Sequence, residues 1–256
     1  MIHSHLINLD QDVERLAFFA ATFSRLGMAF ERTPAVDGRL FCEADYQQFM
    51  ASRPRHGQPW LRGQMGCFLS HYAVWEQIAR GPDRFHAVFE DDIHASDDLK
   101  EILADDRWIP DEVDIVRLET STNRVLLTAR PLLTHARRPA FSVRSTSWCA
   151  GAYLINRRTA RQLVELSALH HAPADAMLYN FEESILARTL NILQMNPAPC
   201  TQDKHLATGN VKFSSNIEAP LSPAERLESG ARRISPAAIL RALVRSLRGY
   251  KRISFQ

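Results

Sequence analysis

Three consecutive acidic residues, Glu90, Asp91 and Asp92, follow the apolar run FHAVF at residues 85–89. Burying one carboxylate without a partner is costly, and three adjacent carboxylates repel each other. Positive charge is therefore expected opposite them. Because Mg²⁺ and Mn²⁺ bind carboxylate oxygens together with substrate phosphates, the triplet indicates a site for a metal ion and a diphosphate. The alternative is an ordinary turn, with Glu90 pointing to solvent.

The elements around this triplet predict an α/β fold. A strand at 5–10, a helix at 11–26 capped by Asp10 and a strand at 30–38 make a β-α-β opening, which favours a parallel sheet with a ligand crevice at the strand ends. We expect further strands at 85–90, 114–119, 148–156 and 191–199, and helices at 43–51, 63–79, 157–169 and 179–190. Ser96 can cap another helix, whose first turn holds Asp97 and Asp98.

Composition indicates a soluble globular protein of one large domain. The chain has 256 residues, a net charge of +2 and a mean hydropathy of −0.24, which argues against a globally basic nucleic-acid binder. Four scattered cysteines lack zinc spacing and favour a reducing, cytoplasmic compartment, with Cys67 and Cys149 read as buried small hydrophobes. Neither a signal peptide nor a membrane-spanning run is expected.

The C-terminal part is basic. From residue 230 onward the chain carries seven basic residues and no acid: Arg232, Arg233, Arg241, Arg245, Arg248, Lys251 and Arg252. We predict an amphipathic helix starting at Ser235, within a C-terminal extension (221–256) that follows the main domain (1–220). Residues 232–252 could contact an anionic membrane as a peripheral anchor. The alternative is a helix docked on the domain with its arginines in solvent.

Four blocks of sequence stand in an order that resembles a known family. They are INLDQDVERLAFFAATFSRLGMAFERTPAVDG (7–38), GQMGCFLSHYAVWEQIA (63–79), AVFEDDI (87–93) and GAYLINRRTARQLVEL (151–166). Together they resemble glycosyltransferase family 25, the bacterial lipooligosaccharide-biosynthesis enzymes akin to collagen galactosyltransferase domains. The resemblance implies a GT-A-like α/β fold with a mixed, mainly parallel sheet flanked by helices. It also implies a UDP-sugar donor, commonly UDP-galactose, Mn²⁺ or Mg²⁺, and inversion at the anomeric carbon.

Carried over to this sequence, the resemblance assigns the metal and nucleotide residues. Asp92 is expected to be the closest metal ligand, with Glu90 or Asp91 contacting the ribose or acting from the second coordination shell. The residues expected to bind the donor are Asn8, Leu9, Arg15, Asp37, Gly38, Ser70 and His71. Ordinary alternatives remain: a surface charge for Arg15, a plain turn at Asp37-Gly38, and a core histidine bonded to a backbone carbonyl for His71.

The reaction also needs a base. An attacking sugar hydroxyl must lose its proton, and a carboxylate within hydrogen-bond reach can accept it. Asp175 matches the aspartate of the family's Pro-Val-Asp block, although Ala174 replaces the valine here. We name Asp175 as the base, with a helix N-cap as its alternative and Glu182 and Glu183 in reserve. His205 could be a further metal or diphosphate ligand, and Lys204 could contact phosphate.

These assignments predict a metal-dependent inverting glycosyltransferase that acts on an oligosaccharide or lipid-linked glycan. A metal-dependent phosphotransferase or hydrolase is a weaker alternative because the sequence has no G-x-x-x-x-G-K-[ST] motif. A catalytically inactive module that binds a sugar nucleotide or a protein is the other alternative. The intact acidic triplet and Asp175 argue against it.

Overall fold

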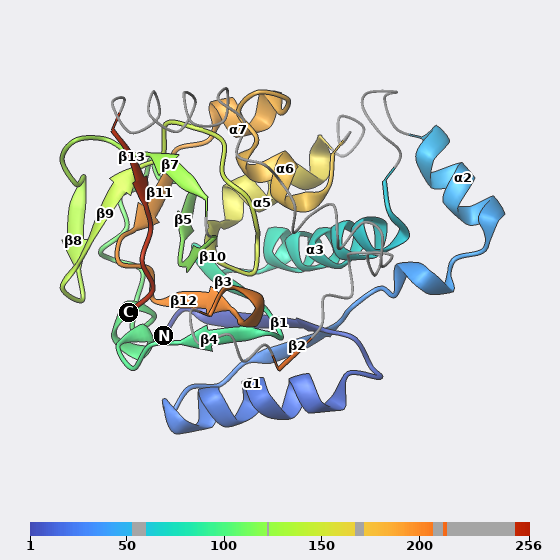
Figure 1. Cartoon of the computed structure of the whole chain (residues 1–256), viewed down its shortest axis with the longest axis horizontal. Helices are drawn as coiled ribbons and strands as arrows, with labels where there is room; N and C mark the ends of the chain where they lie inside the picture. Colours follow the sequence, from blue (N-terminus) through green and yellow to red (C-terminus); the bar gives the residue numbers. More distant parts are fainter. Residues whose placement is uncertain (53–59, 122, 167–171, 207–211, 214–248) are drawn as a thin grey trace, which may run out of the picture.

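A mixed sheet of eight strands forms the centre of the computed structural model, which describes residues 1–52, 60–121, 123–166, 172–206, 212–213 and 249–256. The strand order is β2-β1-β3-β10-β5-β11-β9-β8 (Figure 1). The pairings orient six strands in one direction and β9 and β10 in the other, so the sheet is mostly parallel. Its strands are β1 (His3–Asn8), β2 (Glu31–Pro34), β3 (Phe85–Glu90), β5 (Ile115–Arg117), β8 (Leu133–His135), β9 (Arg138–Ser142), β10 (Ala152–Asn156) and β11 (Ile192–Met195).

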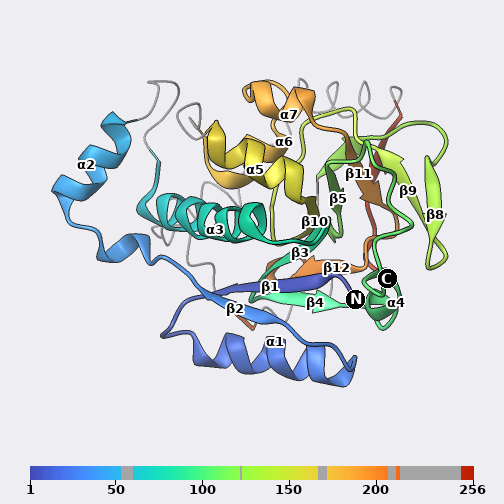
Figure 2. The same ribbon diagram turned by 180° about the vertical axis from the view of Figure 1, so that it is seen from behind.

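Helices cover both faces of this sheet. Figure 2 shows α1 on one side and α3, α5 and α6 on the other. Alternate strand residues enter two separate cores: Leu6 and Phe89 pack with Phe19 of α1, whereas Ile7 and Val88 pack with the α3 side. The helices are α1 (Val13–Arg25), α2 (Glu43–Ala51), α3 (Arg62–Arg80), α4 (Leu99–Ile102), α5 (Arg157–Glu165), α6 (Ala174–Tyr179) and α7 (Ile185–Thr189), with short 3₁₀ turns η1 (Gly38–Leu40) and η3 (Asp203–His205).

A second, small sheet brings the late part of the chain to the acidic triplet. Its strands are β4 (Ile93–Ala95), β12 (Cys200–Gln202) and β6 (Glu119–Thr120), in the order β4-β12-β6. Gln202 pairs with Ile93, and the amide of Asp203 donates to the carbonyl of Asp92 (2.9 Å). Residues more than a hundred positions apart are therefore fixed side by side.

The predicted elements are confirmed in their main positions, with four differences. Asp98 and not Ser96 is the N-cap of α4, so Asp97 and Asp98 precede this helix, and the Ser96 hydroxyl donates to Asp98 Oδ1 (2.6 Å). The N-cap of α1 is Asp12 rather than Asp10, whose carboxylate instead pairs with Arg32 at 2.5 Å. The expected strand at 148–156 begins only at 152. The expected helix at 179–190 is wrong: α6 ends at Tyr179, because Asn180 accepts from the amides that follow it, and Ser184 then caps α7.

The end of the chain differs from the predicted helix as well. Residues 250–252 form strand β13 (Tyr250–Arg252), which pairs with β7 (Arg124–Leu126), so a helix is wrong there. The Gln256 carbonyl then accepts from Arg138 (2.7 Å), and both termini lie close together in Figures 1 and 2. The rest of the predicted basic helix, and the proposed division near residue 220, lie outside the described residues. Among the described residues, no helix combines the length and apolarity needed to cross a bilayer.

Candidate active site

The acidic triplet lies at the carboxyl end of β3, next to the carboxyl end of β1. Asp91 is paired with the cation Arg15. Its Oδ2 accepts from Asn8 Nδ2 (2.8 Å), and its Oδ1 accepts from Arg15 Nη1 (2.8 Å). Burial lowers the pKa of Arg15, but the bonds to Asp91 outweigh this and raise it, so the guanidinium stays charged. Arg15 is not the surface charge of the alternative reading: its side chain is only 12% exposed.

Glu90 points inward and not to solvent, so the ordinary-turn alternative is wrong for this residue. Trp75 Nε1 donates to the hydroxyl of Tyr153 (2.9 Å), which lies 3.0 Å from Nδ1 of His71. Nε2 of His71 is 3.3 Å from Glu90 Oε1. This order places the ring proton on Nε2, where it is donated to the carboxylate. Burial opposes ionisation of Glu90, but the hydrogen bond from His71 lowers its pKa.

His71 is fully buried, and its hydrogen-bond partners here are two side chains. The core-histidine alternative, in which a backbone carbonyl satisfies the ring, therefore does not describe it. The ring holds Glu90 in place and also lines the cavity described below. A role in binding the donor stays a prediction.

Asp92 is the acid of the triplet whose ionisation is opposed most strongly. Burial raises its pKa to about 7, Glu90 and Asp91 add to the shift, and Arg15 and Lys204 oppose it. Gln202 Nε2 donates to Glu90 Oε2 (2.7 Å) and lies 3.4 Å from Asp92 Oδ1. Two carboxylates held side by side, one of which has a raised pKa, are donors that fit a hard divalent cation, because a bound cation favours their ionised forms.

Glu119 is a fourth acid behind the triplet, and no sequence motif singled it out. It is buried; Oε1 accepts from the amide of Gly151 (2.5 Å), and Oε2 has no partner among the described residues. The Gly151 carbonyl in turn accepts from the amide of Glu90 (2.8 Å). Burial raises the pKa of Glu119 to about 8, so it is largely protonated at neutral pH and adds little negative charge.

A tight turn at residues 36–38 packs against α3 and lines the same cavity as the triplet. Ser70 Oγ accepts from the amide of Val36 (2.8 Å) and donates to the carbonyl of Gly66 (2.7 Å), so Ser70 joins the turn to the helix. Gly38 and Gly66 meet backbone to backbone. A Cβ on Gly38 would lie 1.7 Å from the carbonyl oxygen of Arg62, and one on Gly66 would lie 2.5 Å from the Gly38 amide nitrogen.

Asp37 begins this turn as the cap of η1. Its Oδ1 accepts from the amide of Arg39 (3.0 Å), and the carboxylate also pairs with the Arg39 side chain. The hydrogen bond from Arg39, partly opposed by burial, lowers the pKa of Asp37 to about 2. The plain-turn alternative therefore describes part of what Asp37 does, while its position still leaves it facing the cavity.

Most of the predicted site residues line one cavity of about 100 Å³, here called the smaller cavity. The members that the sequence named are Asn8, Leu9, Arg15, Asp37, Gly38, Ser70, His71, Glu90, Asp91, Asp92 and Lys204; Cys67 and Gln202 are the main additions. Cys67, His71 and Glu90 also form a compact group of possible ligand atoms, which does not include Asp92 or His205. The predicted metal set of Glu90, Asp92 and His205 stays a prediction.

A larger cavity of about 340 Å³ adjoins the smaller one, and Cys67, Glu90, Gln202 and Lys204 line both. Asp175 lies on its wall in the first turn of α6. Pro173 occupies the N-cap position, so the N-cap alternative for Asp175 is wrong. The carboxylate accepts from the amides of Ala176 (2.8 Å) and Cys149 (3.2 Å).

The remaining wall of the larger cavity comes from the loop before β10. Buried Arg117 donates to the carbonyls of Trp148 (2.8 Å) and Cys149 (3.3 Å), which fixes the loop, and Cys149 has a positive φ of 71°. The Trp148 residue is 40% exposed. Nε2 of His205 lies 3.7 Å from the sulfur of Cys149. The structure thus brings His205 to the larger cavity.

Three sequence interpretations change at this site. Cys67 and Cys149 are half-buried cavity residues, not core hydrophobes, and all four cysteines are free. Glu182 and Glu183, the reserve bases, are exposed and line neither cavity. The sequence assigned no role to Gln202 or Trp148. Only a Gln two residues after a cysteine, in a weakly matching block, pointed to Gln202.

Comparison with known proteins gives a consistent result. The family model described as "Glycosyltransferase family 25 (LPS biosynthesis protein)" matches residues 1–178. The chain is 31% identical over 219 residues to the lacto-N-neotetraose biosynthesis glycosyltransferase LgtB of Neisseria gonorrhoeae, over 80% of this chain and 76% of that protein. It is 30% identical over 232 residues to LgtE of Neisseria meningitidis serogroup B, covering 85% and 81%. It is 24% identical over 225 residues to the lipooligosaccharide biosynthesis protein lic2B of Haemophilus influenzae, covering 84% and 81%.

Proposed function

The chain belongs to glycosyltransferase family 25 and is a glycosyltransferase, and from this premise we propose that it moves a hexose from a UDP-sugar to a surface glycan. The proposed donor is UDP-galactose and the proposed acceptor is lipooligosaccharide or another lipid-linked glycan. The relatives named for lacto-N-neotetraose and lipooligosaccharide biosynthesis support this acceptor class. The proposal includes a GT-A-like fold, a divalent metal ion and inversion at the anomeric carbon.

The smaller cavity is the proposed nucleotide end of the site. Asp92 and Glu90 would hold Mn²⁺ or Mg²⁺, and when bound the ion supplies positive charge that neutralises the departing diphosphate. Arg15 and Asn8 hold the Asp91 carboxylate in one position, and their bonds offset part of the rise in its pKa that burial causes. Lys204 lies near both acids, since it lowers the pKa of Glu90 and of Asp92, and can contact a phosphate oxygen.

The larger cavity is the proposed acceptor end. Asp175 is the base that takes the proton of the attacking hydroxyl. The amides of Cys149 and Ala176 hold its carboxylate in one orientation. One observation carries this proposal: Asp175 and Glu90 line the same cavity. The proposed base and the proposed donor-binding acid can therefore act on one bound pair of substrates. A hydroxyl entering from the Asp175 side attacks opposite the leaving group, which gives inversion.

A lipid-linked acceptor would bring the enzyme to a membrane surface. We propose a cytoplasmic protein that reaches a lipid-linked acceptor at the inner membrane face, with the basic residues of 232–252 contacting anionic lipid. Lys251 and Arg252 are exposed on β13, which is consistent with such a contact. Binding to vesicles with and without anionic lipid, compared between the wild type and Lys251→Ala/Arg252→Ala, tests this part.

A panel of UDP-sugars with Mn²⁺ tests the proposal as a whole. We expect one donor, UDP-galactose, to release UDP slowly on its own and faster with a glycan acceptor. Phosphate release from nucleotides in place of sugar transfer would instead support a phosphotransferase or hydrolase. Binding of a donor without any turnover, with every acceptor tried, would support an inactive binding module.

A further inference from the structure

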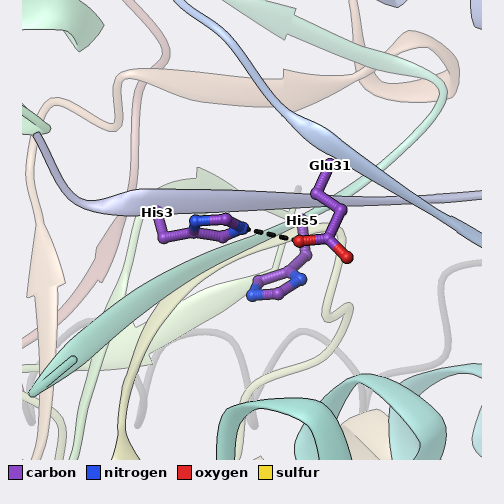
Figure 3. Close-up of side chains that lie close together, drawn as sticks. All are labelled: His3, His5 and Glu31. Atoms are coloured by element: carbon purple, nitrogen blue, oxygen red, sulfur yellow. Dashed lines mark hydrogen bonds and ion pairs between the residues drawn. The ribbon is translucent and has the colours of Figure 1, made fainter. Parts of the chain in front are cut away.

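Two histidines and a glutamate come together at the amino end of β1, at the opposite end of this strand from the candidate active site. His3 and His5 point to the same face of the sheet because they are two residues apart. Glu31 of β2 is the register partner of His5. One ligand atom from each of these three side chains lies within 4.8 Å of the other two, and Figure 3 shows the His3 and His5 rings beside the Glu31 carboxylate.

The His5 ring supplies a second, independent observation. The residue is 3% exposed, and its Nε2 lies 3.0 Å from Nδ1 of His86 on β3. Its Nδ1 is buried and has no hydrogen-bond partner among the described residues. A buried nitrogen without a hydrogen-bond partner destabilises the folded chain. When Nε2–H of His5 donates to His86, Nδ1 of His5 carries a lone pair that can bind a metal ion.

We propose that His3, His5 and Glu31 form a second metal site, which takes a divalent transition-metal ion of the zinc class and is completed by water. Two imidazoles and one carboxylate are a ligand set that zinc uses, and imidazole suits transition metals better than it suits Mg²⁺ or Ca²⁺. The site thus differs in chemistry from the all-oxygen donors of Glu90 and Asp92. It is also independent of the proposed function.

His86 is the positioning residue of this site. A histidine that binds metal commonly donates its other ring N–H to a neighbour, which fixes the tautomer and the ring orientation. The contact of His5 Nε2 with His86 Nδ1 does this here.

The site would fasten the edge of the main sheet. β2 has four residues and pairs only with β1 among the described strands. Near the amino end of β2, Glu31 is joined to His3 of β1 by one hydrogen bond of 2.9 Å. The His3 side chain is 42% exposed and the Glu31 side chain 57% exposed. A metal ion bound to β1 and β2 together would replace this bond and stabilise the folded chain by mass action.

Zinc alone is the probe that tests the site. Titration of the full chain with Zn²⁺ against a competing chelator should give a site that His3→Ala and Glu31→Gln each weaken at least about tenfold. Both side chains are exposed, so both variants should fold. His135→Ala, which removes a histidine outside the cluster, is the matched control and should bind like the wild type. Zn²⁺ should also raise the Tm of the wild type and of the control more than that of the two variants.

Location is tested by anomalous diffraction from crystals soaked in Zn²⁺. We expect a peak between the His3 and His5 rings and the Glu31 carboxylate. Equal Zn²⁺ affinity and stoichiometry in the wild type, His3→Ala and Glu31→Gln would overturn the proposal. A peak found only among Glu90, Cys67 and His71 would overturn it too, because it would assign the binding to the active site.

Discussion

The two cavities of the active site are built in different ways. The smaller cavity is lined largely by ends of regular elements, such as Asn8 in β1, Arg15 in α1 and His71 in α3, and buried bonds connect them. The larger cavity takes more of its lining from loops, in which Trp148, Cys149 and Ala150 lie. Rigid elements suit a ligand part that stays the same, and loops suit a part that varies among relatives. This is the division expected between a nucleotide and an acceptor.

The largest expected effect is at the proposed metal position in the smaller cavity. Asp92→Asn removes a charge that a divalent ion needs, so we expect sugar transfer to fall by about 10³-fold or more. Donor binding should also lose its dependence on Mn²⁺. Steady-state kinetics and Mn²⁺-dependent UDP-sugar binding measure both effects. Asp97→Asn, an exposed acid outside both cavities, is the control. An unchanged UDP-sugar affinity in Mn²⁺ for Asp92→Asn would remove the metal assignment.

The next largest effect concerns the ion pair of Arg15 and Asp91 in the wall of the smaller cavity. Arg15→Ala leaves Asp91 buried without its cation, which should cost about 3 kcal/mol of unfolding free energy and weaken donor binding. Arg138→Ala breaks the comparable Arg138–Asp98 pair, at 2.7 Å, which lies away from both cavities. Denaturant unfolding should show a large loss in both variants, with donor affinity lost only in Arg15→Ala. Equal donor affinity in the two variants would contradict a role for Arg15 at the nucleotide end.

The base assignment tests the larger cavity. Asp175→Asn keeps the shape of the side chain but cannot accept a proton, so kcat should fall by roughly 10²-fold. Donor affinity should stay near that of the wild type, because Asp175 lines only the larger cavity. Glu183→Gln, on an exposed carboxylate beyond both cavities, serves as the control. A near-normal kcat in Asp175→Asn would transfer the role to another group or to water.

Trp148 should have a smaller effect that separates the two cavities. Its side chain borders the larger cavity and offers an apolar face to a sugar ring. We expect Trp148→Ala to raise the KM for the acceptor about three- to tenfold, the scale of one aromatic contact. Donor affinity should not change. A rise in the donor Kd with no change in the acceptor KM would reverse the proposed roles of the two cavities.

The smallest effect on activity is expected at the Arg138–Asp98 pair, which lies away from the site and whose contribution to stability depends on pH. Burial raises the pKa of Asp98, but the bonds from Arg138 outweigh this and lower it. The pair therefore contributes its stability above the ordinary aspartate pKa of about 3.9, and loses it as the pH falls through the lower folded value. The Tm difference between the wild type and Asp98→Asn should be largest near pH 6 and shrink below about pH 4. A difference that stays constant over this range would show that the pair does not depend on the charge of Asp98.

The sequence was most informative where local patterns decide the structure. The helix expected at 63–79 is α3 at 62–80, and β3 has the expected bounds, because apolar periodicity and Gly81 mark them. The smaller cavity was largely predictable for the same reason, since each of its motifs stands at the end of such an element. The resemblance added the roles of these residues, which still need the tests above.

The larger cavity and the bond partners of the triplet were much less predictable. Gln202 reaches Glu90 through β12, whose pairing with β4 joins residues more than a hundred positions apart, and no local periodicity encodes such a pairing. The loop at Trp148 and Cys149 depends on the buried guanidinium of Arg117, which reads in sequence as an ordinary strand residue. Asn180 ends α6 because its side chain accepts from the amides of Glu182 and Glu183, and these bonds compete with those of a continuing helix.

The bare contact of Gly38 with Gly66 gives the site a stiff mechanical link. No side chain lies between the two backbones to take up a displacement, and Ser70 bonds both sides of the contact. A ligand that pushes on residues 36–38 therefore moves α3 as one body, and α3 carries the imidazole of His71 that holds Glu90. Occupancy of the turn is thus expected to reach Glu90, beside the proposed metal position, through the backbone of α3 and the His71 ring.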